Sequence, residues 1–364
     1  MFWRRFLSFS KPAAMTAPLP RGVLAALAAA LLFGAGTPLA KLLLAQASPW
    51  LLAALLYLGS GLGLWLLRRV RGAPGVRLPP GEGKWLAGAV AAGGVLGPVL
   101  LMLGLARMNA SSASLLLNAE GVFTALLAWF VFKENFDRRI ALGMLAIVAG
   151  GLVLAWPGQM DWPGWQPAAC VTAACLAWAI DNNLTRKVSL ADASWIAMVK
   201  GLVAGATNLA LALLLGAAWP APTVVAAAAA VGFASYGASL ALFVVGLREL
   251  GTARTGAYFS VAPFFGAVLA IVLLGEDVTM PLLAAGALMA LGVALHLSER
   301  HEHRHAHEAM MHAHEHVHGA GDPHHDHAHE PSVPPGTRHS HPHQHEPLTH
   351  SHPHFPDAHH RHGH

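Results

Sequence analysis

Charged residues are scarce in this chain. Asp, Glu, Lys and Arg make up 12% of its 364 residues, whereas hydrophobic residues make up 55% and the mean hydropathy is +0.48. Soluble globular domains carry about 25% charged residues, so this composition excludes an ordinary soluble protein. It indicates an integral membrane protein.

Motifs of soluble enzymes are also absent. The sequence has no phosphate-binding loop, no dinucleotide fingerprint and no nucleophile–base constellation, so we expect neither enzymatic activity nor a required cofactor. Without a nucleotide-binding domain, any transport must be driven by an ion or substrate gradient. The two cysteines, Cys170 and Cys175, lie in one apolar segment without metal or redox spacing and are expected to be packing residues.

What the chain does contain is a series of long apolar segments. An apolar helix needs about 20 residues to cross a bilayer. Ten candidates run over residues 22–45, 48–67, 85–105, 109–132, 138–156, 165–185, 194–216, 223–246, 254–274 and 280–298. We predict an all-α integral membrane protein with ten transmembrane helices, and we expect glycines within the spans to bring helices close together.

The cations fall on one side of this predicted bundle. With ten spans both termini share a side, and its loops carry nearly all of the Lys and Arg residues, among them Arg4, Arg5, Arg68 and Arg69; Arg107 alone lies in the opposite loops. This asymmetry predicts that both termini are cytoplasmic. The net charge of +4 therefore reflects topology, and no nucleic-acid partner is expected.

The segments form two repeats. Residues 104–134 and 246–276 align without a gap at an offset of 142, which pairs Gly104 with Gly246 and Glu134 with Glu276. Five spans per repeat is an odd number, so the halves enter the membrane in opposite senses, and alternating access follows. The predicted parts are a cytoplasmic segment 1–20, a first repeat 21–156, a second repeat 157–298 and a tail 299–364.

Polar residues in the first span of each repeat suggest a transport site. At an offset of 145, Gly36-Thr37-Pro38 lies opposite Asp181-Asn182-Asn183. Glycine and proline weaken the helical hydrogen-bond ladder, so we predict matching interruptions here, with Thr37, Asp181 and Asn182 lining the pathway. The alternative is a structural kink in which the asparagines bond neighbouring helices.

Charged residues inside the predicted spans are rarer than uncharged polar residues. Glu120 lies near the middle of the fourth span, where removal from water favours the protonated carboxyl, so it is the candidate proton carrier; the alternative is a neutral acid bonded between helices. Asp181 and Lys200 lie at similar depth and could form an ion pair, or Lys200 could meet an anionic or zwitterionic substrate. Lys41 lies near the outer end of its span and is expected to reach the interface.

Two weaker candidates lie on polar stripes. Asn118 follows Ser111 and Ser114 on one face of the fourth span, and Tyr258 follows Thr255 on the ninth. Such stripes join helices more often than they bind ligands.

These features resemble the drug/metabolite transporter superfamily with two EamA-type domains, over residues 20–298. The resemblance rests on residues 32–41, on residues 112–134 ending Phe132-Lys133-Glu134, and on residues 255–276 ending Leu274-Gly275-Glu276. It implies ten helices in inverted repeats, export of small metabolites, amino acids or drugs, and the plasma (inner) membrane of a bacterium. Tyr57 stands where many relatives carry arginine.

All 24 histidines lie at or after His296. Neutral imidazole binds Ni, Co, Zn and Cu, and the low hydrophobicity of this tail predicts disorder without metal. The candidate metal ligands are His301, His303, His305, His307, His312, His314, His316, His318, His324, His325, His327 and His329. The alternatives to a metal-binding tail are a tail whose charge responds to pH and a low-complexity segment that arose by neutral drift.

Three functions remain. The first is a proton-coupled secondary transporter, an exporter of a small solute, with a metal-binding regulatory tail; the second is a divalent-metal exporter whose tail collects metal; the third is a non-transporting membrane sensor that buffers metal. The membrane part offers no cluster of His, Cys or carboxylates, which favours an organic substrate. The expected partners are the lipid bilayer, a small-molecule substrate and a coupling ion, with the chain as a monomer or homodimer.

Overall fold

The computed structural model divides the chain into two compact units, Met1–Ser298 and Glu299–His364. The residues it describes are 21–76, 78–132, 138–156, 162–188, 191–250, 252–297, 302–307, 310–317, 338–345 and 348–353. The predicted N-terminal segment 1–20 lies outside them.

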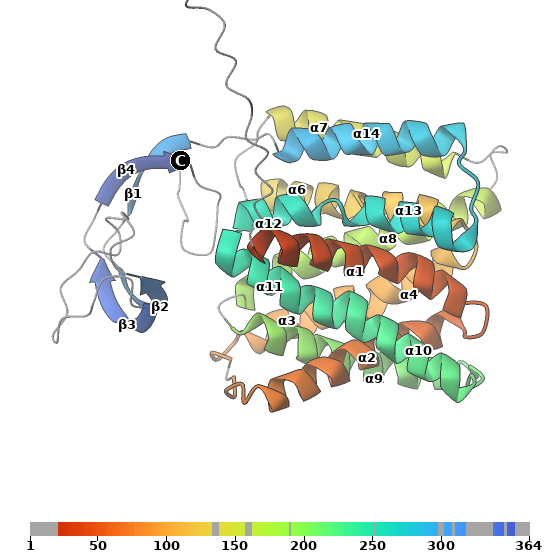
Figure 1. Ribbon diagram of the computed structural model, residues 1–364, viewed down its shortest axis with the longest axis horizontal. Coiled ribbons are helices and arrows are strands. Elements are labelled where there is room, and N and C mark those ends of the chain that lie inside the picture. The colour runs from red at the N-terminus through yellow and green to blue at the C-terminus, as the bar shows by residue number, and fades with distance from the viewer. Residues whose placement is uncertain are drawn as a thin grey trace, which may run out of the picture. The chain divides into compact units, whose positions relative to one another are not determined.

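The first unit is helical (Figure 1). Its first half contains α1 (Arg21–Leu43), α2 (Pro49–Val70), α3 (Gly83–Ala89), π-helix η1 (Val90–Leu96), α4 (Gly97–Leu105), α5 (Ala110–Leu116), α6 (Ala119–Phe132) and α7 (Arg138–Ala155). Its second half contains α8 (Trp162–Thr185), 3₁₀-helix η2 (Arg186–Val188), α9 (Ala193–Leu214), α10 (Pro222–Gly232), π-helix η3 (Phe233–Ala238), α11 (Ser239–Leu250), α12 (Thr252–Phe259), α13 (Ala262–Leu274) and α14 (Met280–Leu297).

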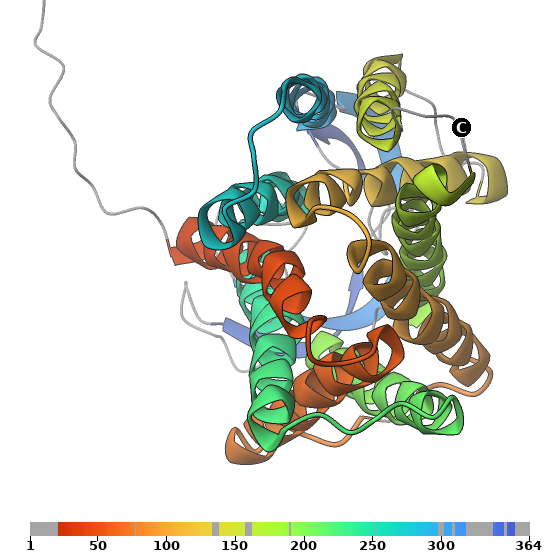
Figure 2. The ribbon, with the colours of Figure 1, turned by 90° about the vertical axis from the view of Figure 1, so that its right-hand side faces the viewer.

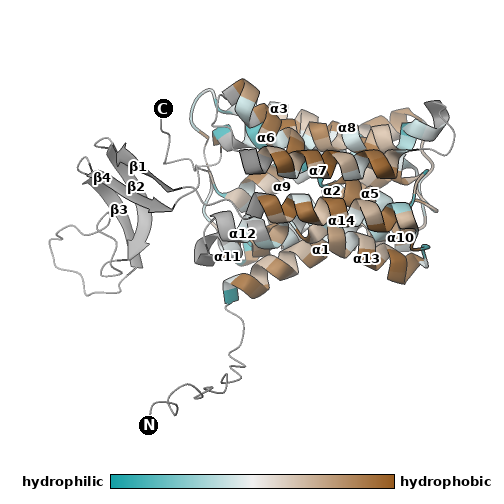
Figure 3. Ribbon diagram, turned by 90° about the horizontal axis from the view of Figure 1, so that it is seen from above, coloured by the Kyte–Doolittle hydropathy of each residue, from teal (hydrophilic) through white to brown (hydrophobic). Residues whose placement is uncertain are grey.

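The surface of these helices suits a membrane. Among the described residues, six helical runs are long and apolar enough to cross a bilayer, and three shorter apolar helices accompany them. Large apolar side chains face outward, among them Leu214 at 83% and Phe130 at 78% exposure. In Figure 3 the helices are mostly brown and polar residues concentrate toward their ends. The all-α membrane class predicted from composition is confirmed, whereas the number of spans stays a prediction.

The halves pack in a two-fold pattern. Equivalent helices contact each other, α2 with α9 and α7 with α14, while α1 contacts α11 and α13 much as α8 contacts α4 and α6 (Figures 1 and 2). Gly61 and Gly201 let α2 and α9 approach until a Cβ on Gly201 would lie 2.8 Å from the Gly61 Cα. The packing role predicted for span glycines is confirmed here.

The helices are interrupted at equivalent places, though not where the sequence suggested. The fourth predicted span breaks between Leu116 and Ala119, and the ninth breaks between Phe259 and Ala262. At the offset of 142, η3 also coincides with the last six residues of η1. Non-α-helical backbone at membrane depth is found where protein or a water-filled cavity surrounds it.

The interruptions predicted in the first spans are wrong. Helix α1 continues through Pro38, and α8 continues through Asp181 and Asn183. Helix α1 buries all three residues of this segment, Gly36, Thr37 and Pro38. Away from water, backbone groups are satisfied mainly by hydrogen bonds within the helix. The helical hydrogen bonds therefore persist on both sides of the one amide hydrogen that proline lacks.

The second unit contains four strands, β1 (Glu302–His307), β2 (Met310–Val317), β3 (Arg338–His345) and β4 (Leu348–Pro353). They form two antiparallel pairs, β1 with β4 and β2 with β3. The disorder that the composition predicts for the metal-free tail stays a prediction. In the second pair, His312, His314 and His316 lie opposite His343, His341 and His339.

Candidate functional site

The best-connected polar residues lie along α8. Glu120 is the second residue of α6, immediately after the break in the fourth predicted span, and the Asn182 amide donates to its carboxylate across 2.8 Å. Thr124, one turn along α6, accepts a longer bond of 3.4 Å from the same amide. Glu120 is half-buried and Asn182 is exposed, so these polar groups stay accessible beside an otherwise apolar helix.

The ion pair predicted between Asp181 and Lys200 is present. The Lys200 ammonium lies 2.6 Å from each oxygen of Asp181, and Thr185 donates to the same carboxylate across 2.8 Å. The two charged side chains are 7% and 19% exposed. Asp181 therefore already has a charged and a neutral partner, an arrangement typical of a structural ion pair, and its place in the pathway stays a prediction.

The π-helix η1 meets this cluster at Gly93. The Tyr57 hydroxyl and the Trp178 indole each donate to the Gly93 carbonyl across 2.9 Å, while Asn208 donates to the Gly94 carbonyl across 3.1 Å. A π-helix shifts the backbone ladder and leaves carbonyls available for such donors. A Cβ on Gly93 would overlap the Asp181 carboxylate, so only glycine fits.

Aromatic rings continue from Gly93 across the bundle. Ring centroids lie 5.7 Å apart for Tyr57 and Tyr236, 5.9 Å for Tyr236 and Phe33, and 5.3 Å for Phe33 and Phe259. These four residues belong to α2, η3, α1 and α12, and each is half-buried. The row therefore links one π-helix to the other and ends at the break in the ninth predicted span.

Sequence reasoning found part of this site. Glu120, Asp181, Asn182 and Lys200 are brought together, whereas Gly93, Tyr57, Trp178 and the aromatic row were missed. The available signal was the position of Tyr57, where the resembling family often has arginine.

The other three predicted residues, Asn118, Thr37 and Tyr258, lie outside the hydrogen-bonded cluster described above. Asn118 is buried and donates to Leu115 O across 2.9 Å and to the Met289 sulfur across 3.8 Å. Thr37 is buried in α1, and Tyr258 is half-buried on α12.

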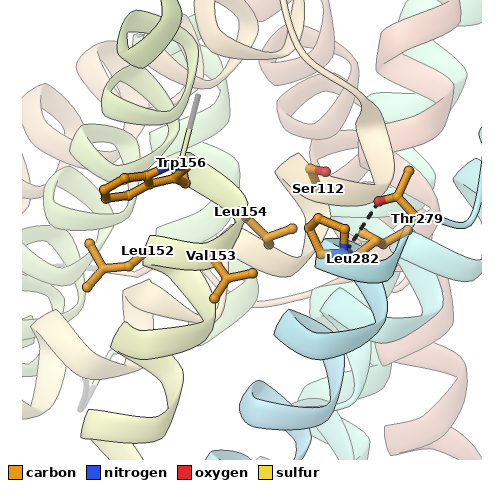
Figure 4. Close-up of a pocket in the computed structure, with 8 residues that line it drawn as sticks. Ser112, Leu152, Val153, Leu154, Trp156, Thr279 and Leu282 are labelled. Atoms are coloured by element: carbon orange, nitrogen blue, oxygen red, sulfur yellow. Dashed lines mark hydrogen bonds between the residues drawn. The ribbon is translucent and has the colours of Figure 1, made fainter. Parts of the chain in front are cut away.

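A separate cavity of about 530 Å³ lies elsewhere (Figure 4). It is formed by α5, the end of α7 and the start of α14, and is lined by Ser112, Leu152, Val153, Leu154, Trp156, Thr279, Pro281 and Leu282. Because its wall is mostly apolar and includes no charged residue, it does not carry the polar chemistry found along α8.

No metal centre is evident in the part of the chain that the structure describes, where no group of three or more His, Cys, Asp or Glu side chains gathers. Cys175 is buried with its thiol 3.6 Å from Leu116 O, in keeping with a packing role, and Cys170 is also a free thiol. Of the predicted tail ligands, His301, His318, His324, His325, His327 and His329 lie outside the described residues. His303, His305, His307, His312, His314 and His316 lie on β1 and β2.

The family follows from comparison with known proteins. The EamA-like transporter family matches residues 20–156 and 167–298, which are the two helical halves. The chain belongs to this family. A transporter of Methanothermobacter thermautotrophicus described as uncharacterized is 28% identical to this chain over 290 residues. The aligned region covers 75% of this chain and 84% of the length of that relative.

Two further similarities accompany the EamA match. A probable 4-amino-4-deoxy-L-arabinose-phosphoundecaprenol flippase subunit ArnE of Pseudomonas fluorescens is 36% identical over 85 residues, covering 23% of this chain and 74% of its own. A solved crystal structure superposes with a TM-score of 0.58 at 20% sequence identity. The superposed region covers 76% of this chain and 95% of the solved chain, and this similarity shows the fold alone. The EamA halves make this chain a membrane transporter of small solutes.

Proposed function

We propose that this EamA protein is a secondary active transporter that exports a small metabolite, amino acid or drug-like solute by alternating access, coupled to protons through Glu120. The observation that carries the proposal is the 2.8 Å hydrogen bond between Asn182 and Glu120 at a helix break. An ionisable residue within a membrane span marks a functional site unless a partner neutralises it, and the partner of Glu120 is a neutral amide.

The chemistry of the site supports proton exchange. Glu120 and Asp181 supply two carboxyls, and Lys200 supplies one ammonium that is already bonded to Asp181. Glu120 is therefore free to gain and lose a proton without breaking the ion pair. Its half-buried position next to the exposed Asn182 supports a route for protons and solute to this carboxyl.

The packing supports alternating access. Equivalent helices of the two halves contact each other along a two-fold pattern, and their interruptions coincide. Rocking one half against the other would expose the region around Glu120 to each face in turn. In this proposal the protein lies in a bacterial inner membrane as a monomer or homodimer with both termini cytoplasmic, and the His-rich tail binds divalent metal and regulates transport.

The test uses purified protein in liposomes under an imposed pH gradient. A panel of amino acids and cationic drugs is added singly, and proton movement is followed with a trapped pH dye. We expect at least one solute to drive proton movement in the parent and in Asp277→Asn, which changes an exposed carboxyl, but not in Glu120→Gln. Undiminished coupled transport in Glu120→Gln would remove Glu120 from the mechanism.

The tail is tested in the same liposomes. Truncation after Glu299 is expected to abolish binding of Ni or Zn, measured by calorimetry on the purified protein, while Glu120-dependent transport persists. If the liposomes transport the metal itself, and if truncation of the tail reduces that transport, the result would favour the metal exporter instead.

A further inference from the structure

The turn between α4 and α5 is held by charged residues from distant helices. It lies at the end of the bundle where α1 finishes, here called the distal end, which the predicted topology places outside. At the end of α4, the Lys41 ammonium donates to Leu105 O across 2.6 Å and to Met108 O across 2.9 Å. At the start of α5, the Glu276 carboxylate accepts from the amides of Ala110 and Ser111 across 2.6 and 2.9 Å.

These contacts match the charges of the helix ends. The last carbonyls of a helix carry partial negative charge and attract a cation, while the first amides carry partial positive charge and attract an anion. Asn109, at the N-cap of α5, makes no side-chain capping bond, so Glu276 supplies the missing acceptor from 165 residues away. Gly275 makes this possible, since its φ of 65° turns the chain sharply after α13.

The same region closes the seam between the two halves. On α13, a Cβ at Gly266 would lie 2.7 Å from the Ser114 hydroxyl and 2.8 Å from Gly34 O, so α1, α5 and α13 meet there without spare room. Within this closed seam the hydroxyls of Ser111 and Ser114 are buried without a hydrogen-bond partner. Buried hydroxyls normally find partners, and water entering an opened seam would supply them.

We infer that Lys41 and Glu276 are positioning residues that act as a distal latch, holding the seam of α1, α5 and α13 closed, and that the seam opens during transport to hydrate Ser111 and Ser114. The Lys41 ammonium binds backbone carbonyls at this end of the bundle, and the expectation that it reaches the membrane interface stays a prediction. The inference rests on alternating access. It does not depend on which residue carries the proton.

The test measures opening from one face. In a background with Cys170→Ala and Cys175→Ala, Ser114→Cys places a thiol in the seam, and its labelling by a membrane-impermeant maleimide is timed in intact cells and in inside-out vesicles. We expect slow labelling in the parent and a rise of about tenfold or more with Glu276→Gln or Lys41→Met, from the cell exterior only, because each change removes charge-assisted bonds to the turn. Glu276→Asp should give an intermediate rate, and Asp277→Asn should match the parent.

A control thiol separates a latch from general loosening. Ala212→Cys introduces a thiol at a fully buried position on α9 that is predicted to lie near the same face. The latch requires that its labelling stay slow in the Glu276→Gln and Lys41→Met backgrounds. Equal acceleration at both thiols, or no acceleration at position 114, would overturn the inference. If labelling rises as expected while Glu120→Gln keeps coupled transport, the latch stands and the proton proposal fails.

Discussion

The amide of Asn182 on α8 donates a hydrogen bond across 2.8 Å to the carboxylate of Glu120 on α6. The two residues are 62 positions apart and lie in different repeats, so the bond joins the halves that alternating access would move. A carboxyl held by a neutral donor keeps both protonation states available, whereas a cationic partner would favour only the ionised form.

The adjacent asparagines provide a matched test of this bond. Asn183 donates to Ala179 O on its own helix across 2.9 Å and makes a longer bond of 3.4 Å to Thr124 O. We expect Asn182→Ala to change the pH dependence of solute-driven proton movement in liposomes, because Glu120 loses its donor. Asn183→Ala should leave that dependence unchanged and lower only thermal stability. Identical pH profiles for Asn182→Ala and the parent would contradict the role of Asn182.

The Asp181–Lys200 pair is expected to be structural. Removing one partner leaves a buried charge uncompensated, which costs about 3–5 kcal/mol, whereas removing both leaves none. Lys200→Met should therefore reduce the melting temperature in detergent more than the double variant Asp181→Asn/Lys200→Met does. A stable double variant that has lost transport would instead indicate that the pair binds substrate.

Gly93 should tolerate no side chain. A Cβ there overlaps the Asp181 carboxylate, so Gly93→Ala must displace either η1 or the ion pair, at a cost of about 1–3 kcal/mol. Gly121→Ala on α6 is the control, since a Cβ at Gly121 meets no atom within 4 Å. Thermal melting of both variants in detergent checks this; equal melting temperatures would show that η1 adjusts freely.

Asp192, outside the membrane spans, predicts a pH-dependent contribution to stability. Burial raises its pKa, but hydrogen bonds from Ser194 and from the Trp195 amide, together with the Arg68 guanidinium 2.7 Å away, outweigh burial and hold the pKa below its ordinary value. The stabilisation is therefore complete above the ordinary aspartate pKa of about 3.9 and is lost as the pH falls through the lower folded value.

Asp192→Asn should accordingly melt at a lower temperature than the parent at pH 7, with the difference shrinking below about pH 3.9. Melting curves at several pH values test this, with Asp277→Asn as an exposed comparison. A difference that stays constant down to pH 3 would show that the charge of Asp192 is not what stabilises the end of α2 against α9.

The helical class and the ion pair were accessible from sequence because each depends on local counting. Runs of apolar residues locate the helices, and the helical rise places Asp181 and Lys200 at one depth. The helix breaks were not accessible in this way. Pro38 and the nearby glycines predicted weak helical hydrogen bonding, but the buried surroundings of α1 keep this segment helical. The observed break before Glu120 contains no proline that could have indicated it.

By itself, the sequence determined that this chain is a duplicated helical membrane protein, because hydrophobicity and repeat spacing are properties of residues along the chain. Only the tertiary structure decided which backbone groups meet which side chains. The Gly93 carbonyl receives Tyr57 and Trp178, and the turn before Ala110 receives Lys41 and Glu276, through contacts between residues far apart in sequence. Such contacts depend on distances between packed helices, which no local pattern encodes.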